Sequence, residues 1–263
     1  MIKTEIMGVL NITPDSFYDG SSNSISNLQY IINKIGSFKY ADIIDVGCES
    51  SRPGSNSISL KEEFQRLKIL DGLDFDNKIL SIDSYKPEII EYCLNNHFSM
   101  INDISGGGEN FLNINLAKKY SAKIVLMHML GRPKNMQDKP KYINIIDELN
   151  HFFSLRIDYA MSIGMNIDDI IIDPGIGFGK TVEHNDLIIM NLKEFKHFKC
   201  KILLGVSRKS FLSVDNDSPK ERLFQTIGAN ALSAFNGADI LRVHDVHETY
   251  KMLKITDRIK IHG

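Results

Sequence analysis

The feature that most constrains the fold is a regular alternation of short apolar runs with longer amphipathic segments. Each apolar run has six to eight residues and is rich in isoleucine, valine or leucine. That composition is typical of strands buried on both faces, as in a parallel sheet. The runs cover residues 5–12, 42–47, 78–83, 99–105, 123–128, 169–175, 201–207 and 239–245.

Helical patterns occupy the gaps between the runs. Pro87 suits the first turn of one helix, and Gly164 and Gly237 suit the ends of two others. Strict alternation of strand and helix predicts a parallel sheet with helices outside it. Eight units in 263 residues favour a single (β/α)8 TIM barrel over residues 1–263, with an open doubly wound sheet as the alternative. The clearest helical patterns cover residues 60–73, 86–96, 145–164 and 218–237, and those after the first, fourth and eighth runs are less sharply marked.

Composition and charge exclude several classes of protein. A formal net charge of -2 and a pI near 6.4 do not suggest a nucleic-acid partner, which favours a strongly basic face. No apolar run is long enough to span a membrane, and the first ten residues lack the apolar core of a signal peptide. Cys48, Cys93 and Cys200 fit no metal-binding spacing, which is typical of a reducing compartment. We therefore expect a cytoplasmic enzyme without nucleic-acid or membrane partners.

Polar residues recur where the predicted strands end, which is the catalytic face of a (β/α)8 barrel. Arg208, Lys209, Arg242 and His244 follow or end the last two strands. Barrels often bind a phosphate group at this position, and arginine and lysine are its usual ligands. This basic group predicts an anionic, phosphate-bearing ligand.

A second group is acidic or amide-bearing and comes from the third, fourth and sixth strands. Asp83, Asn102 and Asp173 offer acceptors for N–H groups, and Asn102 also offers donors. They suit the edge of a flat, nitrogen-rich heterocycle, although a divalent metal is an alternative ligand. Met127 is either core filler or a polarisable contact for the face of that heterocycle.

Two loops on the predicted catalytic face are rich in turn residues. They cover residues 11–22, which include Phe17, and residues 49–57, which include Arg52. Plain surface loops are the alternative, but function concentrates on loops at this face. The glycine-rich segment 173–180 lacks the spacing of a phosphate-binding Walker loop and indicates only a close backbone approach.

Eight motifs in order along the chain resemble the dihydropteroate synthase family. Any one of them is weak evidence, but together they span nearly the whole chain. They are GVLNITPDSF (8–17), DVGCESSRPG (45–54), SIDSYKPE (81–88), INDISGG (101–107), MHMLGRPKNMQ (127–137), DPGIGFGK (173–180), GVSRKS (205–210) and RVHDV (242–246).

This resemblance implies a transferase that joins a pterin pyrophosphate to p-aminobenzoate in folate biosynthesis, and hence a sulfonamide target. The implied chemistry is SN1-like: the bond to pyrophosphate breaks first, with the help of Mg2+, and the arylamine then attacks the pterin cation. The resemblance also implies a homodimer, to which the apolar Leu232, Phe235 and Met252 are candidate contributors.

The resemblance assigns site residues by position. Catalytic roles fall to Asp15, Phe17, Arg52 and Lys209, and pterin binding to Asp83, Asn102, Met127, Asp173, Phe178 and Lys209. Pyrophosphate binding falls to Asn11, Arg242 and His244, with Asn11 as the metal ligand, and p-aminobenzoate binding to Ser51, Arg52, Pro53 and Ser210.

Two positions depart from the family pattern, and two other functions remain open. Cys48 stands where glycine is usual, and Ser51 stands where threonine is usual. One alternative is a pterin-binding methyltransferase barrel, but its substrate has no pyrophosphate to explain the SRKS and RVH motifs. The other is a catalytically silent pterin-binding paralogue, although Asp15, Phe17 and Arg52 are all present.

Overall fold

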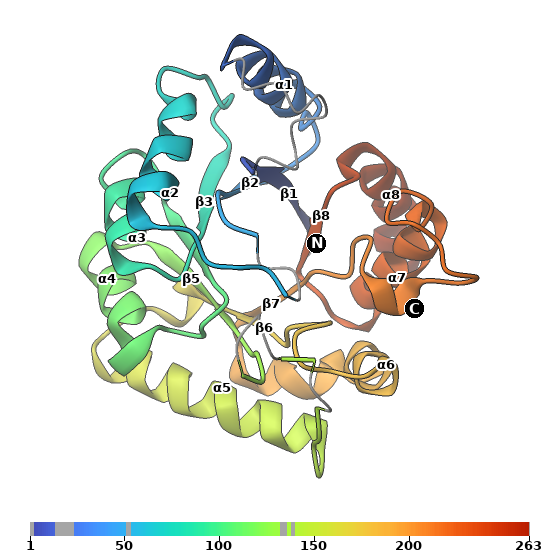
Figure 1. The fold of residues 1–263 in the computed structure, drawn as a ribbon. Coiled ribbons are helices and arrows are strands. Elements are labelled where there is room, and N and C mark those ends of the chain that lie inside the picture. Colours follow the sequence, from blue (N-terminus) through green and yellow to red (C-terminus); the bar gives the residue numbers. More distant parts are fainter. Residues whose placement is uncertain (1–2, 14–23, 51–53, 132–135, 138–139, 263) are drawn as a thin grey trace.

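The eight predicted strands form a closed parallel barrel in the order β1 to β8, which confirms the (β/α)8 TIM-barrel prediction. The computed structural model describes residues 3–13, 24–50, 54–131, 136–137 and 140–262. β1 pairs with both β2 and β8, so the sheet has no edge and the open-sheet alternative is wrong. Figure 1 shows the helices arranged around the strands. The strands are β1 (Glu5–Asn11), β2 (Ile43–Gly47), β3 (Ile79–Asp83), β4 (Met100–Asp103), β5 (Lys123–Met127), β6 (Ile170–Asp173), β7 (Lys201–Leu204) and β8 (Ile240–Val243).

A helix follows every strand. The α-helices are α1 (Ser24–Gly36), α2 (Leu60–Leu67), α3 (Pro87–Leu94), α4 (Leu112–Tyr120), α5 (Ile145–Ser162), α6 (Val182–Met190), α7 (Leu223–Asn236) and α8 (Val246–His262). Short 3-10 turns cover Lys68–Leu70, Glu109–Phe111, Ile167–Asp169, Leu192–Phe198 and Ser210–Leu212.

One predicted helix begins later than its pattern indicated. The segment 218–237 was expected to be helical throughout, but α7 starts at Leu223. Ser218 and Glu221 form a separate turn, in which the backbone N–H of each bonds to the other residue. Arg222 donates from its guanidinium to the carbonyls of Arg208 and Asp217, which fixes this turn beside the loop after β7.

An apolar layer closes the inside of the barrel below the polar residues. It contains one buried side chain from each strand except β3, whose Ile79 packs against it partly buried. A larger apolar cluster fills the space between the outer face of the strands and the helices. The barrel is therefore a packed core, and its ligand space lies only above this inner layer. The inner layer consists of Met7, Ile43, Met100, Val125, Ile171, Leu203 and Ile240.

Within the part of the chain that the structure describes, no helix combines the length and the apolar character needed to cross a membrane.

Candidate active site

The strand register brings several predicted site residues to one level at the carboxyl end of the barrel. Asn11 pairs with Gly47, Gly47 with Asp83, and Asp83 with Asn102. Paired residues of parallel strands point to the same face of the sheet. A β-carbon added at Gly47 would lie 3.4 Å from both Asn11 Oδ1 and Asp83 Oδ2. Glycine at position 47 therefore leaves open space between these two polar side chains.

Asp45 is the centre of a buried polar network just inside this level. Its side chain is fully buried and accepts hydrogen bonds from Ser81 Oγ at 2.6 Å and Asn102 Nδ2 at 2.9 Å. Arg242 Nε also donates to Asp45, at 2.6 Å. An unpaired buried carboxylate is costly, and these three donors satisfy its lone pairs. Asp45 thus fixes the side chains of Asn102 and Arg242 from below.

The side chain of Arg242 also reaches from β8 to the carboxylate of Asp83 on β3. Its Nη2 lies 2.6 Å from Asp83 Oδ2, so one guanidinium serves both Asp45 and Asp83. Burial alone would lower the pKa of Arg242, but the two carboxylates outweigh it and raise the pKa above its ordinary value. The pKa of Asp83 is raised to about 7, because burial outweighs the stabilising charge of Arg242.

Asp173 and Met127 lie on the opposite side of the barrel, paired in register across β5 and β6. Asp173 is buried, and its Oδ1 accepts a 2.7 Å hydrogen bond from the backbone N–H of Gly175. Burial raises the pKa of Asp173, an effect opposed by the charge of Lys209. Met127 is also buried, so its thioether lies beside this carboxylate in the barrel wall.

Lys209 reaches into the barrel from the loop after β7. Its ammonium donates to the carbonyl of Ile176 and lies 4.7 Å from the ring centroid of Phe178. Burial lowers its pKa to about 8, although Asp173 favours the charged form. The absence of a side chain at Gly205 and Gly177 leaves room for this lysine. A cation, an aromatic ring and a carboxylate thus lie together on the side opposite Asp83.

His244 follows β8 and is held by the loop after β7. Its Nδ1 lies 3.0 Å from Ser207 Oγ, and its backbone N–H donates to the same hydroxyl. Burial, together with the positive charges of Arg242 and Arg208, lowers the pKa of His244 to about 3. The imidazole is therefore neutral at physiological pH.

Arg208 is placed differently from the other members of the predicted basic group. It forms a two-point ion pair with Asp245, at 2.9 Å from Nε and 2.5 Å from Nη2. Its backbone has a φ of 60°, and its N–H donates to the buried hydroxyl of Thr226. Asp245 thus occupies Nε and Nη2 of the Arg208 guanidinium. The role of Arg208 here is to shape the turn that places Lys209 in the site.

A second buried lysine lies behind the glycine-rich segment 173–180. Lys180 is 3% exposed, and its Nζ lies 3.1 Å from both His128 Nδ1 and the carbonyl of Phe178. A β-carbon at Gly175 would lie only 1.9 Å from the carbonyl of His128, so this turn requires glycine. The predicted close backbone approach is found here, between the loop after β6 and the end of β5.

Some predicted site residues lie at or beyond the edge of what the structure describes. Ser210 is exposed at the start of a 3-10 turn directly after Lys209. Asp15, Phe17, Ser51, Arg52 and Pro53 lie outside the described residues.

The described residues contain no group of three or more histidine, cysteine, aspartate or glutamate side chains that could hold a metal ion. The amide oxygen of Asn11 beside Gly47 and Asp83 does fit Mg2+. That ion prefers oxygen ligands and is usually bound by one or two protein groups together with substrate phosphates.

Sequence reasoning missed two residues of this region. Asp45 lies within the second predicted strand but was given no role, and Lys180 was not singled out. The sequence does contain a signal for Asp45, because a carboxylate within the apolar run DIIDVG indicates a functional role. Lys180 gives no such signal, because a lysine at the end of a glycine-rich loop is ordinarily exposed.

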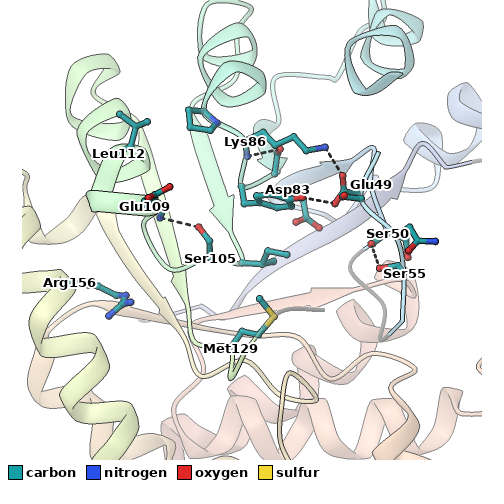
Figure 2. A pocket seen from close by; sticks show the side chains of 18 of the residues that line it. Glu49, Ser50, Ser55, Asp83, Lys86, Ser105, Glu109, Leu112, Met129 and Arg156 are labelled. Carbon is teal, nitrogen blue, oxygen red and sulfur yellow. Dashed lines mark hydrogen bonds and ion pairs between the residues drawn. The ribbon is translucent and has the colours of Figure 1, made fainter. Parts of the chain in front are cut away.

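A cavity of about 920 Å³ adjoins Asp83 on the side of α3, α4 and α5. Figure 2 shows Glu49, Asp83, Lys86, Ser105 and Arg156 among the residues that line it. The barrel mouth is thus open beside Asp83, on the side of the residues that line this cavity.

The fold and the site define a pterin-binding barrel enzyme, and comparisons with known proteins support that class. The family model described as "Pterin binding enzyme" matches residues 7–244. The chain is 38% identical to the dihydropteroate synthase of Synechocystis sp., over 98% of this chain and 90% of the relative. It is 36% identical to that of Escherichia coli, over 96% and 90%. The Yersinia pestis dihydropteroate synthase, solved with a sulfonamide drug complex, superposes with a TM-score of 0.89 at 34% identity, over 98% and 95%.

The chain belongs to the dihydropteroate synthase family. These nearly full-length matches confirm the predicted transferase activity in folate biosynthesis. They favour it over both alternatives, the methyltransferase barrel and the silent paralogue.

Proposed function

We propose that the chain condenses 7,8-dihydropterin-6-ylmethyl diphosphate with p-aminobenzoate, which gives 7,8-dihydropteroate and pyrophosphate. The observation that carries this proposal is the arrangement of Asp83, Asn102 and Arg242 around one buried carboxylate at the barrel mouth. It combines acceptors for a heterocycle edge with a fixed positive charge. The single barrel domain would act in the cytoplasm, which agrees with three free cysteines.

The pterin would bind between the two sides of the barrel mouth. Asp83 and Asp173 would accept from its ring N–H and amino groups, while Asn102 can donate and accept. Lys209 would keep Asp173 ionised and donate to a ring acceptor. The flat faces of the ring would contact Met127 and Phe178, because thioether and aromatic groups pack well on such surfaces.

The pyrophosphate would lie over β1 and β8, where Asn11 ends β1, Arg242 lies near the end of β8 and His244 follows it. Asn11 would supply an oxygen ligand to Mg2+, which neutralises charge on the departing pyrophosphate. Arg242 would stabilise the same charge as the C–O bond breaks, and neutral His244 can donate one hydrogen bond to it. No activated protein nucleophile is needed for this step.

The p-aminobenzoate would bind beside Ser210, one residue after Lys209, with Ser51, Arg52 and Pro53 from the loop after β2. The arylamine nitrogen would then attack the pterin methylene cation that remains after the C–O bond has broken, and the arylammonium so formed would lose one proton to the released pyrophosphate. Asp15 and Phe17 would complete the site from the loop after β1. Exclusion of water matters at this stage, because water would trap the cation.

The test of this function is an assay of the pyrophosphate that the purified protein releases from its substrate. Release should require the pterin pyrophosphate, p-aminobenzoate and Mg2+ together, and 7,8-dihydropteroate should appear in equal amount. Omission of either substrate is the control. Release from the pterin pyrophosphate alone, at the same rate, would show a hydrolase and contradict the proposal.

We also propose that the chain is a homodimer that uses α7 and α8. Leu232 and Phe235 are 60% and 47% exposed on α7, and Ile255 and Ile259 are 55% and 53% exposed on α8. Exposed apolar side chains on two packed helices are typical of a contact surface. Met252, the third residue expected there, is buried, because it packs into the core. Sedimentation at micromolar concentration should give the dimer mass, and Leu232→Glu should give the monomer.

A further inference from the structure

One ammonium group holds both ends of the segment 49–58, the loop that follows β2. Lys86 Nζ lies 2.6 Å from Glu49 Oε2 at the start of the segment and 2.8 Å from the carbonyl of Ile58 at its end. Its third contact, also at 2.6 Å, is Oε2 of Glu63 on α2. A lysine ammonium has three N–H donors, so all three are used within the protein. Lys86 therefore has no donor left for a ligand.

The two ends of the segment are also bonded directly to each other. The backbone N–H of Ile58 donates to Glu49 Oε2 at 3.0 Å, and Tyr85 donates from its hydroxyl to Glu49 Oε1 at 3.1 Å. Figure 2 shows Lys86 and Glu49 joined at the edge of the cavity, close to Asp83. The carboxylate of Glu49 is thus the point at which both ends of the segment meet.

This network is anchored in the strand that carries Asp83. Lys86 follows Asp83 by three residues and is the residue directly before α3. Ser84 donates to the fully buried Glu63 at 2.9 Å, which ties the intervening residues to α2. Burial works against a charged Lys86, but hydrogen bonds to Glu49 and Glu63 outweigh it and raise its pKa. The ammonium is therefore charged at any physiological pH.

We propose that Lys86 is a positioning residue for the second substrate. It fixes Glu49 and Ile58, the two ends of the segment, relative to β3, which carries Asp83 of the proposed pterin subsite. This inference rests on the proposed function, in which Ser51, Arg52 and Pro53 bind p-aminobenzoate. Lys86 acts through the loop and touches neither substrate, so its loss affects the two substrates unequally.

Two variants and one control test the proposal. Lys86→Met removes the charge but leaves the buried Glu63 without its ion-pair partner. Glu49→Gln keeps the Lys86–Glu63 ion pair and weakens only the contacts to the loop, so it tests the idea if the first variant folds poorly. Lys119→Met is the control, because Lys119 forms an exposed ion pair with Glu91, on the helices.

Both test variants should raise the KM for p-aminobenzoate by about ten- to a hundredfold, because small misplacements of a substrate are costly. In the same variants, the KM for the pterin pyrophosphate should change by less than about twofold. Independently of activity, hydrogen exchange of the backbone N–H of Ile58 should become faster in both variants. The control should match the wild type in all three measurements.

The result that would overturn the proposal is an unchanged KM for p-aminobenzoate in Glu49→Gln, or an equal rise in both KM values. Unchanged exchange at Ile58 would also overturn it. Failure of the proposed function is a separate outcome, since it would appear as a wild-type chain that makes no dihydropteroate.

Discussion

Arg242 on β8 and Asp83 on β3 form an ion pair across the barrel mouth, with Nη2 and Oδ2 2.6 Å apart. These strands are not neighbours in the barrel, so the contact spans its open end. It couples the proposed pyrophosphate and pterin subsites, because a phosphate that competes for Arg242 leaves the Asp83 carboxylate available to ring N–H groups. Asp45 holds the same arginine from below and limits how far the guanidinium moves.

Asp173→Ala should weaken pterin binding by about tenfold or more. The change leaves ligand N–H groups without acceptors, at a cost of about 1–3 kcal/mol. Titration calorimetry measures this directly, with Asp168→Ala in the exposed turn before β6 as the control. Equal affinity of the variant and the wild type would show that Asp173 does not contact the pterin.

The pH profile of kcat/KM for the pterin substrate should be a narrow bell. Asp83 must be ionised to accept from the ring, and its pKa is raised to about 7, so activity should rise as pH increases through this value. Lys209 must be protonated, and its pKa is lowered to about 8, so activity should fall above that pH. Initial rates measured from about pH 5.5 to about pH 9.5 give the profile, because this range includes both pKa values. A profile flat over that range would contradict both assignments.

The barrel could be predicted from the sequence because parallel strands buried on both faces leave an unambiguous pattern. Every predicted strand agrees with the structure to within three residues at either end. The start of α7 was less predictable, because Ser218-Pro219 is a good helix start locally, and a tertiary contact decides against it. That contact is the hydrogen bond from Arg222 to the carbonyl of Arg208, which lies 14 residues earlier in the loop after β7.

Candidate site residues could be named from the sequence, but their partners could not. Arg208 and Arg242 are indistinguishable as phosphate candidates until the structure pairs the first with Asp245 and the second with Asp45 and Asp83. The buried position of Lys180 depends on the way the loop after β6 packs against His128. Such arrangements depend on contacts between strands far apart in the chain, which no local pattern encodes.

The three cysteines should be unreactive in the native protein. Cys48, Cys93 and Cys200 are 0%, 1% and 4% exposed, and burial raises the pKa of each thiol. The thiolate is the reactive form, so both access and ionisation are suppressed. An aromatic disulfide reagent should modify none of them until a denaturant is added, and then all three. Rapid modification of one thiol at neutral pH would mean that the segment around it opens readily.

The position of Cys48 also explains its tolerance in place of the usual glycine. Its side chain lies in the core cluster, and its carbonyl accepts a 2.6 Å hydrogen bond from Arg66 Nη1. The thiol therefore fills apolar space beneath the loop and does not enter the barrel mouth. Cys48→Ser should destabilise the fold by about 1–3 kcal/mol, because it buries a hydroxyl. Urea unfolding measures the loss, and an unchanged midpoint would show that the hydroxyl finds a partner.

The binding of the second substrate should depend on pyrophosphate and Mg2+. Three of the proposed p-aminobenzoate residues, Ser51, Arg52 and Pro53, come from the loop after β2, and Phe17 would complete the site from the loop after β1. Both loops are rich in turn residues and poor in apolar anchors. Pyrophosphate and Mg2+ near Asn11, Arg242 and His244 would add contacts that order these loops. A sulfonamide should therefore bind at least about tenfold more tightly when both are present. By linkage, the sulfonamide should tighten pyrophosphate binding by the same factor.

Calorimetry with and without pyrophosphate and Mg2+ measures this coupling in both directions. Arg52→Ala should abolish most of it, while pterin binding alone should change little, because the proposed pterin contacts come from other strands. Lys119→Met, on the outer surface, should leave both affinities as they are in the wild type. Equal sulfonamide affinity under the two conditions would show that the pocket is formed before pyrophosphate binds. In that case the loops contribute a rigid wall, and the order of substrate binding must be set elsewhere in the site.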